Sequence, residues 1–348
     1  MILTSSWLAP QANNNTADKP FSDHFKGGEI DVQDMRTTRN IPVKMPVEAV
    51  VKQIRSGTDF ANGRFPLNLL NLKFLGQAPP GPAFLNARRF SLIPAINSRL
   101  EADWTGEVTA GKRTQATMLG AREIDLVSSM TFSLFAQRGS MTGFHVDVPD
   151  GTWIRNCWGL KVWIFPEDFR ESDTAEFREL GHDWVPSAVR FIVLEPGDTL
   201  VMPAGRATPH AVLTLEDSHM VGGMFLDADC VLGTIRKLLW VTENPNAANE
   251  AIPLQLLTGW HHLRDLFLAR GPSEGDVTEF DSLTNRLRDA LSCSCTGPCE
   301  KLLEEKPLGR SFLPWSPSLA LSENAWSRTG QTLLLDCFNQ LSSHLQRF

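Results

Sequence analysis

The spacing of apolar and polar residues separates the chain into a strand-rich middle and a helix-rich C-terminal third. In the middle, short apolar-rich segments are separated by turn residues, as antiparallel all-β folds require. These segments predict strands at 129–136, 141–147, 158–165, 189–194, 199–202, 210–215 and 220–226. A charged segment at 166–180 predicts a helix inserted between two of the strands.

Elsewhere apolar residues recur at intervals of three and four, which is the helical period. They predict helices at 47–55, 90–104, 231–242, 253–269, 277–291 and 327–345, the second of them ending before Gly106. Residues 1–20 are polar and lack any period, so we expect them to be disordered.

The expected organisation therefore has four parts. A disordered N-terminus at 1–20 precedes an α/β flanking region at 21–125, which packs outside the barrel and shapes the substrate entrance. The barrel occupies 126–229, and a helical region at 230–348 either dimerises the protein or braces the barrel.

Two histidines and one aspartate in the predicted barrel form a candidate ligand set. His145-x-Asp147 ends one predicted strand, and His210 begins another 65 residues later. Residues two apart on a strand point to the same face, so His145 and Asp147 project together. Two imidazoles and one carboxylate are the ligands that hold a non-haem Fe(II) while leaving neighbouring coordination positions open.

Residues around this set extend the pattern. Thr142 lies three residues before the first histidine, Gly159-x-Lys161 follows the aspartate, and Pro-Gly-Asp and Pro-x-Gly turns precede the second histidine. In this order and spacing, residues 125–230 resemble the Jumonji-C (JmjC) branch of the cupin-fold, 2-oxoglutarate-dependent oxygenases. The resemblance implies a mainly β fold with helical additions, a double-stranded β-helix (jelly-roll) barrel, with Fe(II) held by the two histidines and the aspartate.

The same resemblance implies a site for 2-oxoglutarate. Lys161 lies in an apolar strand, where a buried unpaired charge is costly unless a bound dicarboxylate compensates it; a solvent-facing lysine is the alternative. JmjC proteins bind the far carboxylate with such a lysine, to which Thr142 would add a hydroxyl donor. The offset of Thr142 from His145 is odd, so Gly143 must permit a bend if both are to point inward. Thr152 is a further cofactor contact by position.

The chain contains no tyrosine. JmjC relatives often use a tyrosine to help hold the 2-oxoglutarate carboxylate. Another residue must therefore serve in this chain.

A cysteine cluster is the second chemical signal. Cys293-x-Cys295-x3-Cys299 places three thiols within seven residues, which could supply three ligands of a structural zinc. The fourth would be Cys230, Cys337 or a histidine. This spacing differs from the usual pair of Cys-x2-Cys knuckles, and three reduced loop thiols explain it equally well.

The remaining polar residues of interest receive structural interpretations. His219 is interpreted as a hydrogen-bonded strand residue, and His182 and the pair His261-His262 as structural. Asp198 belongs to a turn, where aspartate is favoured for its hydrogen bonds to the backbone.

Composition restricts the partners. The formal net charge of −7 argues against a protein that coats nucleic acid electrostatically. The chain contains no run of about 18 apolar residues, so we expect no membrane span. The N-terminus lacks the features of a secretory signal. Six cysteines without a sign of secretion suggest reduced thiols, so we expect an intracellular protein of the nucleus or cytoplasm.

The function implied by the resemblance is hydroxylation of a protein side chain, with a protein or peptide as substrate. Three alternatives stay open: an N-methyl-lysine (histone) demethylase, a small-molecule oxygenase, and a catalytically silent cupin-like binding module. Demethylase relatives often hold the substrate cation with tyrosine, which is absent here. The intact ligand set with Lys161 argues against the silent module.

Overall fold

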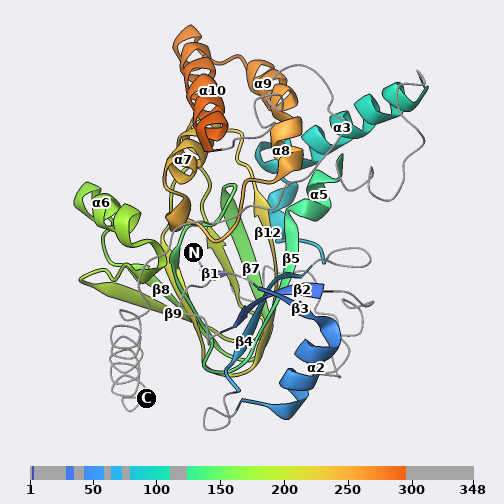
Figure 1. Ribbon diagram of the computed structural model, residues 1–348. Helices are drawn as coiled ribbons and strands as arrows, with labels where there is room; N and C mark the ends of the chain where they lie inside the picture. Colours follow the sequence, from blue (N-terminus) through green and yellow to red (C-terminus); the bar gives the residue numbers. More distant parts are fainter. Residues whose placement is uncertain are drawn as a thin grey trace.

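The computed structural model of the protein describes residues 2–3, 29–34, 43–58, 64–72, 79–109 and 124–294. Its centre is a β barrel, and most of the helices gather at one end of that barrel (Figure 1). The barrel positions the candidate ligands, and the helical end packs against the segments that carry them.

Two antiparallel sheets form the barrel within the described residues. The smaller sheet has the order β6-β11-β8-β9, built from Met141–His145, His210–Thr214, Lys161–Pro166 and Val189–Leu194. The larger sheet contains β10-β7-β12-β5, built from Thr199–Met202, Gly151–Trp158, Ser218–Phe225 and Thr131–Ala136. The chain passes repeatedly from one sheet to the other, as in the jelly rolls of cupins. The predicted fold class is therefore confirmed.

The flanking region extends the larger sheet. Beyond β5 lie β4 (Leu67–Leu72), β2 (Glu29–Asp34) and β3 (Val43–Pro46). The described part of this region thus lies beside the barrel strands and continues their sheet, and its expected role at the substrate entrance stays a prediction. One face of these strands packs on α2 (Val47–Ser56), since Val50 belongs to the same apolar cluster as residues of β2 and β4.

A short strand at the start of the chain pairs at the opposite edge. Strand β1 (Ile2–Leu3) runs antiparallel to β10. The expectation of disorder is wrong for these two residues, and the rest of 1–20 lies outside the described residues.

The helices follow the predicted pattern closely but not at every boundary. They are α3 (Leu92–Thr109), α5 (Leu126–Ser129), α6 (Glu171–Leu180), α7 (Val231–Glu243), α8 (Leu254–Thr258), α9 (Trp260–Leu268) and α10 (Glu274–Ser294). The described residues also include the 3-10 turns η3 (Ala83–Asn86), η4 (Arg88–Phe90), η5 (Gly181–Asp183) and η6 (Pro245–Ala247). The helix predicted at 327–345 lies outside the described residues.

Glycine is involved in three of the boundaries that differ from the prediction. The predicted strand at 158–165 is two strands, because Gly159 turns the chain with φ +80° between β7 and β8. Helix α3 continues through Gly106 to Thr109 instead of ending before it. The predicted helix at 253–269 divides at Gly259, where an added Cβ would lie 2.5 Å from Ile96 of α3.

The two faces of the small sheet belong to different apolar clusters. Trp163 of β8 and Val212 of β11 face the barrel interior, together with residues of the large sheet. Ile164, Ala211 and Leu213 lie on the opposite face and pack in the main core with the C-terminal helices. Both faces are buried, so these strands lack the polar alternation of a half-exposed sheet. Among the described helices, none combines the length and the apolar character needed to cross a membrane.

Candidate metal centre

The structure brings His145, Asp147 and His210 together at one end of the barrel interior. The Nε2 atoms of both imidazoles lie 3.6 Å from Oδ1 of Asp147. The rings are 4.3 Å apart between centroids, and one ligating atom from each residue lies within 4.8 Å of the others. Strands β6 and β11 achieve this because His145 and His210 are paired directly in the ladder.

Each imidazole is held in one orientation by its own backbone. His145 Nδ1 is 2.8 Å from the Gly143 carbonyl, and His210 Nδ1 is 2.9 Å from the Thr208 carbonyl. A carbonyl can only accept, so Nδ1 carries a proton, and in the neutral ring Nε2 keeps its lone pair. Both lone pairs are therefore available to a metal beside Asp147.

The electrostatics fit a bound cation. Burial lowers the pKa of His145 to about 3, with a further contribution from His210, so the ring is neutral at physiological pH. Burial opposes ionisation of Asp147, but the two histidines and Thr152 outweigh it and lower the pKa of that carboxyl. His210 Nε2 and Asp147 Oδ2 are buried without a hydrogen-bond partner. Two oriented imidazoles, one carboxylate and two unpartnered buried atoms make a set that fits a divalent transition metal.

A register shift brings Thr142 to the same interior as His145. On β6 the pairing advances three residues, from His145 to Thr142, while on β11 it advances two, from His210 to Val212. The extra residue is the irregularity that the odd offset required, and it lies at Gly143 or Phe144. The bend predicted in this strand is therefore present.

Lys161 lies deeper in the barrel than the triad. It begins β8 opposite Thr214, four residues along β11 from His210, or about 13 Å at the rise of a strand. It shares a face with Trp163, which belongs to the interior cluster. Lys161 is 3% exposed, and burial lowers the pKa of its ammonium to about 8. Burial is the one cause of this shift, with no charged partner among the described residues, and the low exposure of Lys161 shows that the solvent-facing alternative is wrong.

Two amides missed by the sequence analysis meet Thr142. Asn68 Nδ2 donates to Thr142 Oγ1 at 3.0 Å and to Gln33 Oε1 at 2.9 Å, and the Thr142 hydroxyl donates to Gln33 Oε1 at 3.2 Å. Asn68 is 3% exposed, and its Oδ1 has no hydrogen-bond partner. An isolated polar residue between leucines, as in Leu67-Asn68-Leu69, was the only signal available.

Other residues complete the surroundings of the triad. The ring of Trp163 stacks on His210 at 4.9 Å, and its Nε1 is buried without a partner. Thr152 is buried, and its hydroxyl helps to lower the pKa of Asp147. His182 of η5 lies 6.1 Å from His145 between ring centroids, and burial lowers the pKa of His182 to about 4. The interpretation of His182 as a purely structural residue therefore misses its position beside the triad. The segment between α6 and β9 brings His182 there.

The other residues that received a structural interpretation form polar contacts within the fold. Ser133 Oγ is 2.7 Å from His219 Nε2 on adjacent strands, and Glu195 N donates to Asp198 Oδ2 at 3.0 Å in the expected turn. His262 Nε2 is 2.8 Å from Asp103 Oδ2, with His261 at 3.6 Å from the same oxygen. In this second group Asp103 and His261 are exposed and His262 is buried, and hydrogen bonding between α3 and α9 accounts for it.

The zinc hypothesis stays a prediction. Cys293 falls in the last turn of α10, but its side chain is outside the described part, as are Cys295, Cys299 and Cys337. Cys230 is described and is a free thiol.

Comparisons with known proteins give limited similarity. No family model matches the chain. KK-1 biosynthesis cluster protein D of Curvularia clavata is 26% identical over 235 residues, which cover 65% of this chain. The chain spans 22% of the length of that curated relative.

Similar solved structures include members of the cupin superfamily. A cupin superfamily protein of Desulfitobacterium hafniense DCB-2 is 16% identical over 28% of this chain and 69% of its own, with a TM-score of 0.20. A variant of oxalate decarboxylase from B. subtilis is 15% identical over 28% of this chain and 21% of its own, with a TM-score of 0.20. Similarity at this level adds nothing to the strand order, from which the cupin-type barrel follows.

Proposed function

We propose that the protein is an Fe(II)- and 2-oxoglutarate-dependent oxygenase of the JmjC type that hydroxylates a protein side chain. The observation that carries this proposal is the pairing of two features in one barrel interior. At one end lie two oriented imidazoles and a carboxylate, and deeper in the barrel lies a buried ammonium without a counter-ion.

The triad would hold the iron, and the barrel interior would hold the cosubstrate. Fe(II) with 2-oxoglutarate and O2 supplies oxidative decarboxylation to succinate and CO2, coupled to hydroxylation of a C–H bond. His145 and His210 bind through Nε2, and the Asp147 carboxylate compensates part of the metal charge. Trp163 stacks on His210 and keeps the ring in place as well as excluding water from that face.

Lys161 and Thr142 would bind the far carboxylate of 2-oxoglutarate, and Asn68 would take the part of the absent phenol. The orientation of a buried amide follows from its hydrogen bonds and not from its shape. Reversing the amides of both Asn68 and Gln33 keeps their three contacts with each other and with Thr142. The unpartnered atom of Asn68 then becomes an NH2 donor, which is what a carboxylate requires.

One observation favours a second substrate class. The curated relative is named for a biosynthesis cluster, although this chain matches only 22% of its length. A small-molecule oxygenase with the same iron and cosubstrate chemistry is therefore the second candidate, and the triad and Lys161 serve both.

The test is succinate formation by the purified protein with Fe(II), 2-oxoglutarate, and pools of peptides and of small metabolites. We expect turnover that Asp147→Ala abolishes, with cooperative thermal unfolding retained because the core does not depend on the metal. Asp168→Ala, a change of an exposed carboxylate, should leave turnover intact. A wild-type protein that neither binds nor decarboxylates 2-oxoglutarate would favour the silent binding module instead.

A further inference from the structure

We propose that Asp150 is a positioning residue for the metal centre: it ties the segment carrying Asp147 to the segment that precedes His210, and helix α7 fixes this tie. The proposal rests on the proposed function, because it concerns the same metal. It adds the C-terminal helical region to the parts on which metal binding depends.

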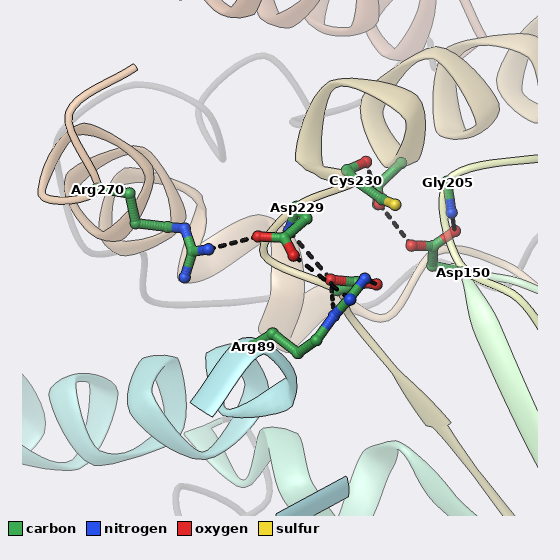
Figure 2. Close-up of polar contacts among 8 residues, drawn as sticks. Arg89, Asp150, Gly205, Asp229, Cys230 and Arg270 are labelled. Atoms are coloured by element: carbon green, nitrogen blue, oxygen red, sulfur yellow. Dashed lines mark hydrogen bonds and ion pairs between the residues drawn. The ribbon is translucent and has the colours of Figure 1, made fainter. Parts of the chain in front are cut away.

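The carboxylate of Asp150 contacts both segments. Asp150 follows Asp147 by three residues and is 2% exposed. Its Oδ1 accepts a hydrogen bond of 2.7 Å from the backbone N–H of Gly205 (Figure 2). Gly205 lies between β10 and β11, five residues before His210. One side chain thus joins the two loops from which the ligands arise.

Helix α7 holds Asp150 from the other side. The Thr234 hydroxyl donates to Oδ2 of Asp150, and Lys237 Nζ donates to the Asp150 carbonyl at 2.8 Å. Lys237 Nζ also lies 3.8 Å from Asp150 Oδ1. Thr234 and Lys237 are three residues apart on the helix, so they share the face that meets the ligand loop.

The start of α7 packs closely against the backbone at Gly205, so neither segment can shift far. An added Cβ at Gly205 would lie 2.7 Å from Cys230 Cβ, and one at Gly233 would lie 2.4 Å from the Gly205 carbonyl oxygen. Gly205 also has φ +81°, which favours glycine. The start of α7 therefore presses directly on the backbone that leads to His210.

The buried ion pair of Asp150 and Lys237 indicates a role other than stabilising the fold. Burial raises the pKa of Asp150 and lowers that of Lys237, although each partner opposes the shift of the other. Replacing a buried ion pair by apolar groups is often neutral or stabilising, so such a pair is weak evidence for a stabilising function. Directed hydrogen bonds, in contrast, fix the distance between two loops in a way that apolar contacts do not.

A second polar network, exposed in part, lies beside the tie. Arg89 pairs with Asp227 and Asp229, and Asp229 pairs with Arg270 (Figure 2). Both side chains of the Arg270–Asp229 pair are more than a third exposed, so this pair contributes little to stability or position, whereas Arg89 holds the buried Asp227 with two hydrogen bonds. Arg270→Ala therefore serves as a control for general loss of charge near α7.

The decisive experiment measures the affinity of metal-free protein for Mn(II) by loss of the free-ion EPR signal. Asp150→Leu/Lys237→Met removes the tie and both charges, whereas Asp150→Asn/Lys237→Met removes the charges and keeps an acceptor for Gly205 N–H. We expect the first variant to bind Mn(II) at least about tenfold more weakly. The second variant and Arg270→Ala should stay within about threefold of wild type.

Two outcomes would overturn the proposal while leaving the proposed function in place. One is wild-type affinity in Asp150→Leu/Lys237→Met, and the other is an equal loss in both double variants. A wild-type chain that takes up no Mn(II), or takes it up equally after His210→Ala, would overturn both proposals.

A second measurement, hydrogen exchange, uses the wild-type protein and so does not require that any variant folds. In the metal-free wild-type protein, the backbone amide of Gly205 should exchange slowly with deuterium, because Asp150 already accepts its hydrogen. Exchange at the rate of an unprotected amide would mean that the tie is not formed before the metal binds, and it would overturn the proposal.

Discussion

The imidazole rings of the metal centre are oriented by carbonyls from their own strands, two residues away in each case. His145 donates to Gly143 and His210 to Thr208. The local sequence thus supplies both the ligand and the group that sets its tautomer. This explains why a short motif and its spacing could predict that His145, Asp147 and His210 lie together.

Residues that reach the site from distant segments could not be predicted in this way. Asn68 lies 74 positions from Thr142, and Asp150 contacts Lys237 across 87 positions. Their partners are set by the tertiary fold, and each looks like an ordinary polar residue in its own segment. His182 was assigned a structural role for the same reason.

Lys161 leads to a prediction on pH. The pKa of its ammonium is about 8 in the free protein, because burial disfavours the charge. A dianion requires the charged form, so binding takes up a proton once the pH exceeds that pKa. The affinity for 2-oxoglutarate should be full below about pH 8 and fall above it, by up to about tenfold per pH unit.

The measurement is calorimetric titration of 2-oxoglutarate into Mn(II)-loaded protein between pH 7 and pH 9.5. Lys161→Met should weaken binding by about 1.5–3 kcal/mol at pH 7 and remove the fall at higher pH. Lys52→Met, on the surface helix α2, is the matched control and should behave as wild type. A Lys161→Met protein with the wild-type pH profile would contradict the assignment.

The secondary-structure elements were predictable where one pattern dominated. Strands β9, β10 and β11 were predicted closely because turn residues flank each apolar run. Strand β7 was missed: its interior positions include Thr152 and Asn156, while Trp153 lies in an apolar cluster on the outer face. Ile154 also faces the interior and Arg155 shares the face of Trp153, so polar and apolar residues are mixed on both faces and the period of two is hidden.

The turn at Gly159 between β7 and β8 gives a prediction for stability. Gly159 has φ +80°, and an added Cβ would lie 2.1 Å from the Asp217 carbonyl oxygen. Gly57, at the end of α2, has φ +68° with nothing within 4 Å of an added Cβ. Gly57→Ala should cost about 1 kcal/mol of unfolding free energy, and Gly159→Ala at least about 2 kcal/mol more.

Urea denaturation of the two variants and the wild type checks this difference. Both substitutions impose a positive φ on alanine, and only Gly159→Ala adds a contact with the Asp217 carbonyl oxygen, to which we ascribe the excess. Equal losses of unfolding free energy in the two variants would show that the turn at Gly159 accommodates the added Cβ without a further cost.

Across the whole molecule, the barrel and the C-terminal helices form one connected core. The main apolar cluster includes residues of β6, β8 and β11 together with residues of α7, α9 and α10. Val146 N, one residue before Asp147, donates to the Ala247 carbonyl of η6 at 2.8 Å. The helical region thus braces the end of the barrel at which the ligands lie, which is one of its two predicted roles; dimerisation stays a prediction.

The most direct test of the central claim is an anaerobic titration of 2-oxoglutarate into the protein loaded with Fe(II), followed by visible absorption. If the triad binds iron and the barrel interior holds the cosubstrate, a metal-to-ligand charge-transfer band should grow to one equivalent. His210→Ala should give no band, and Lys161→Met should give the same band at higher 2-oxoglutarate concentration. A wild-type protein that binds Fe(II) but develops no band at any 2-oxoglutarate concentration would contradict the account.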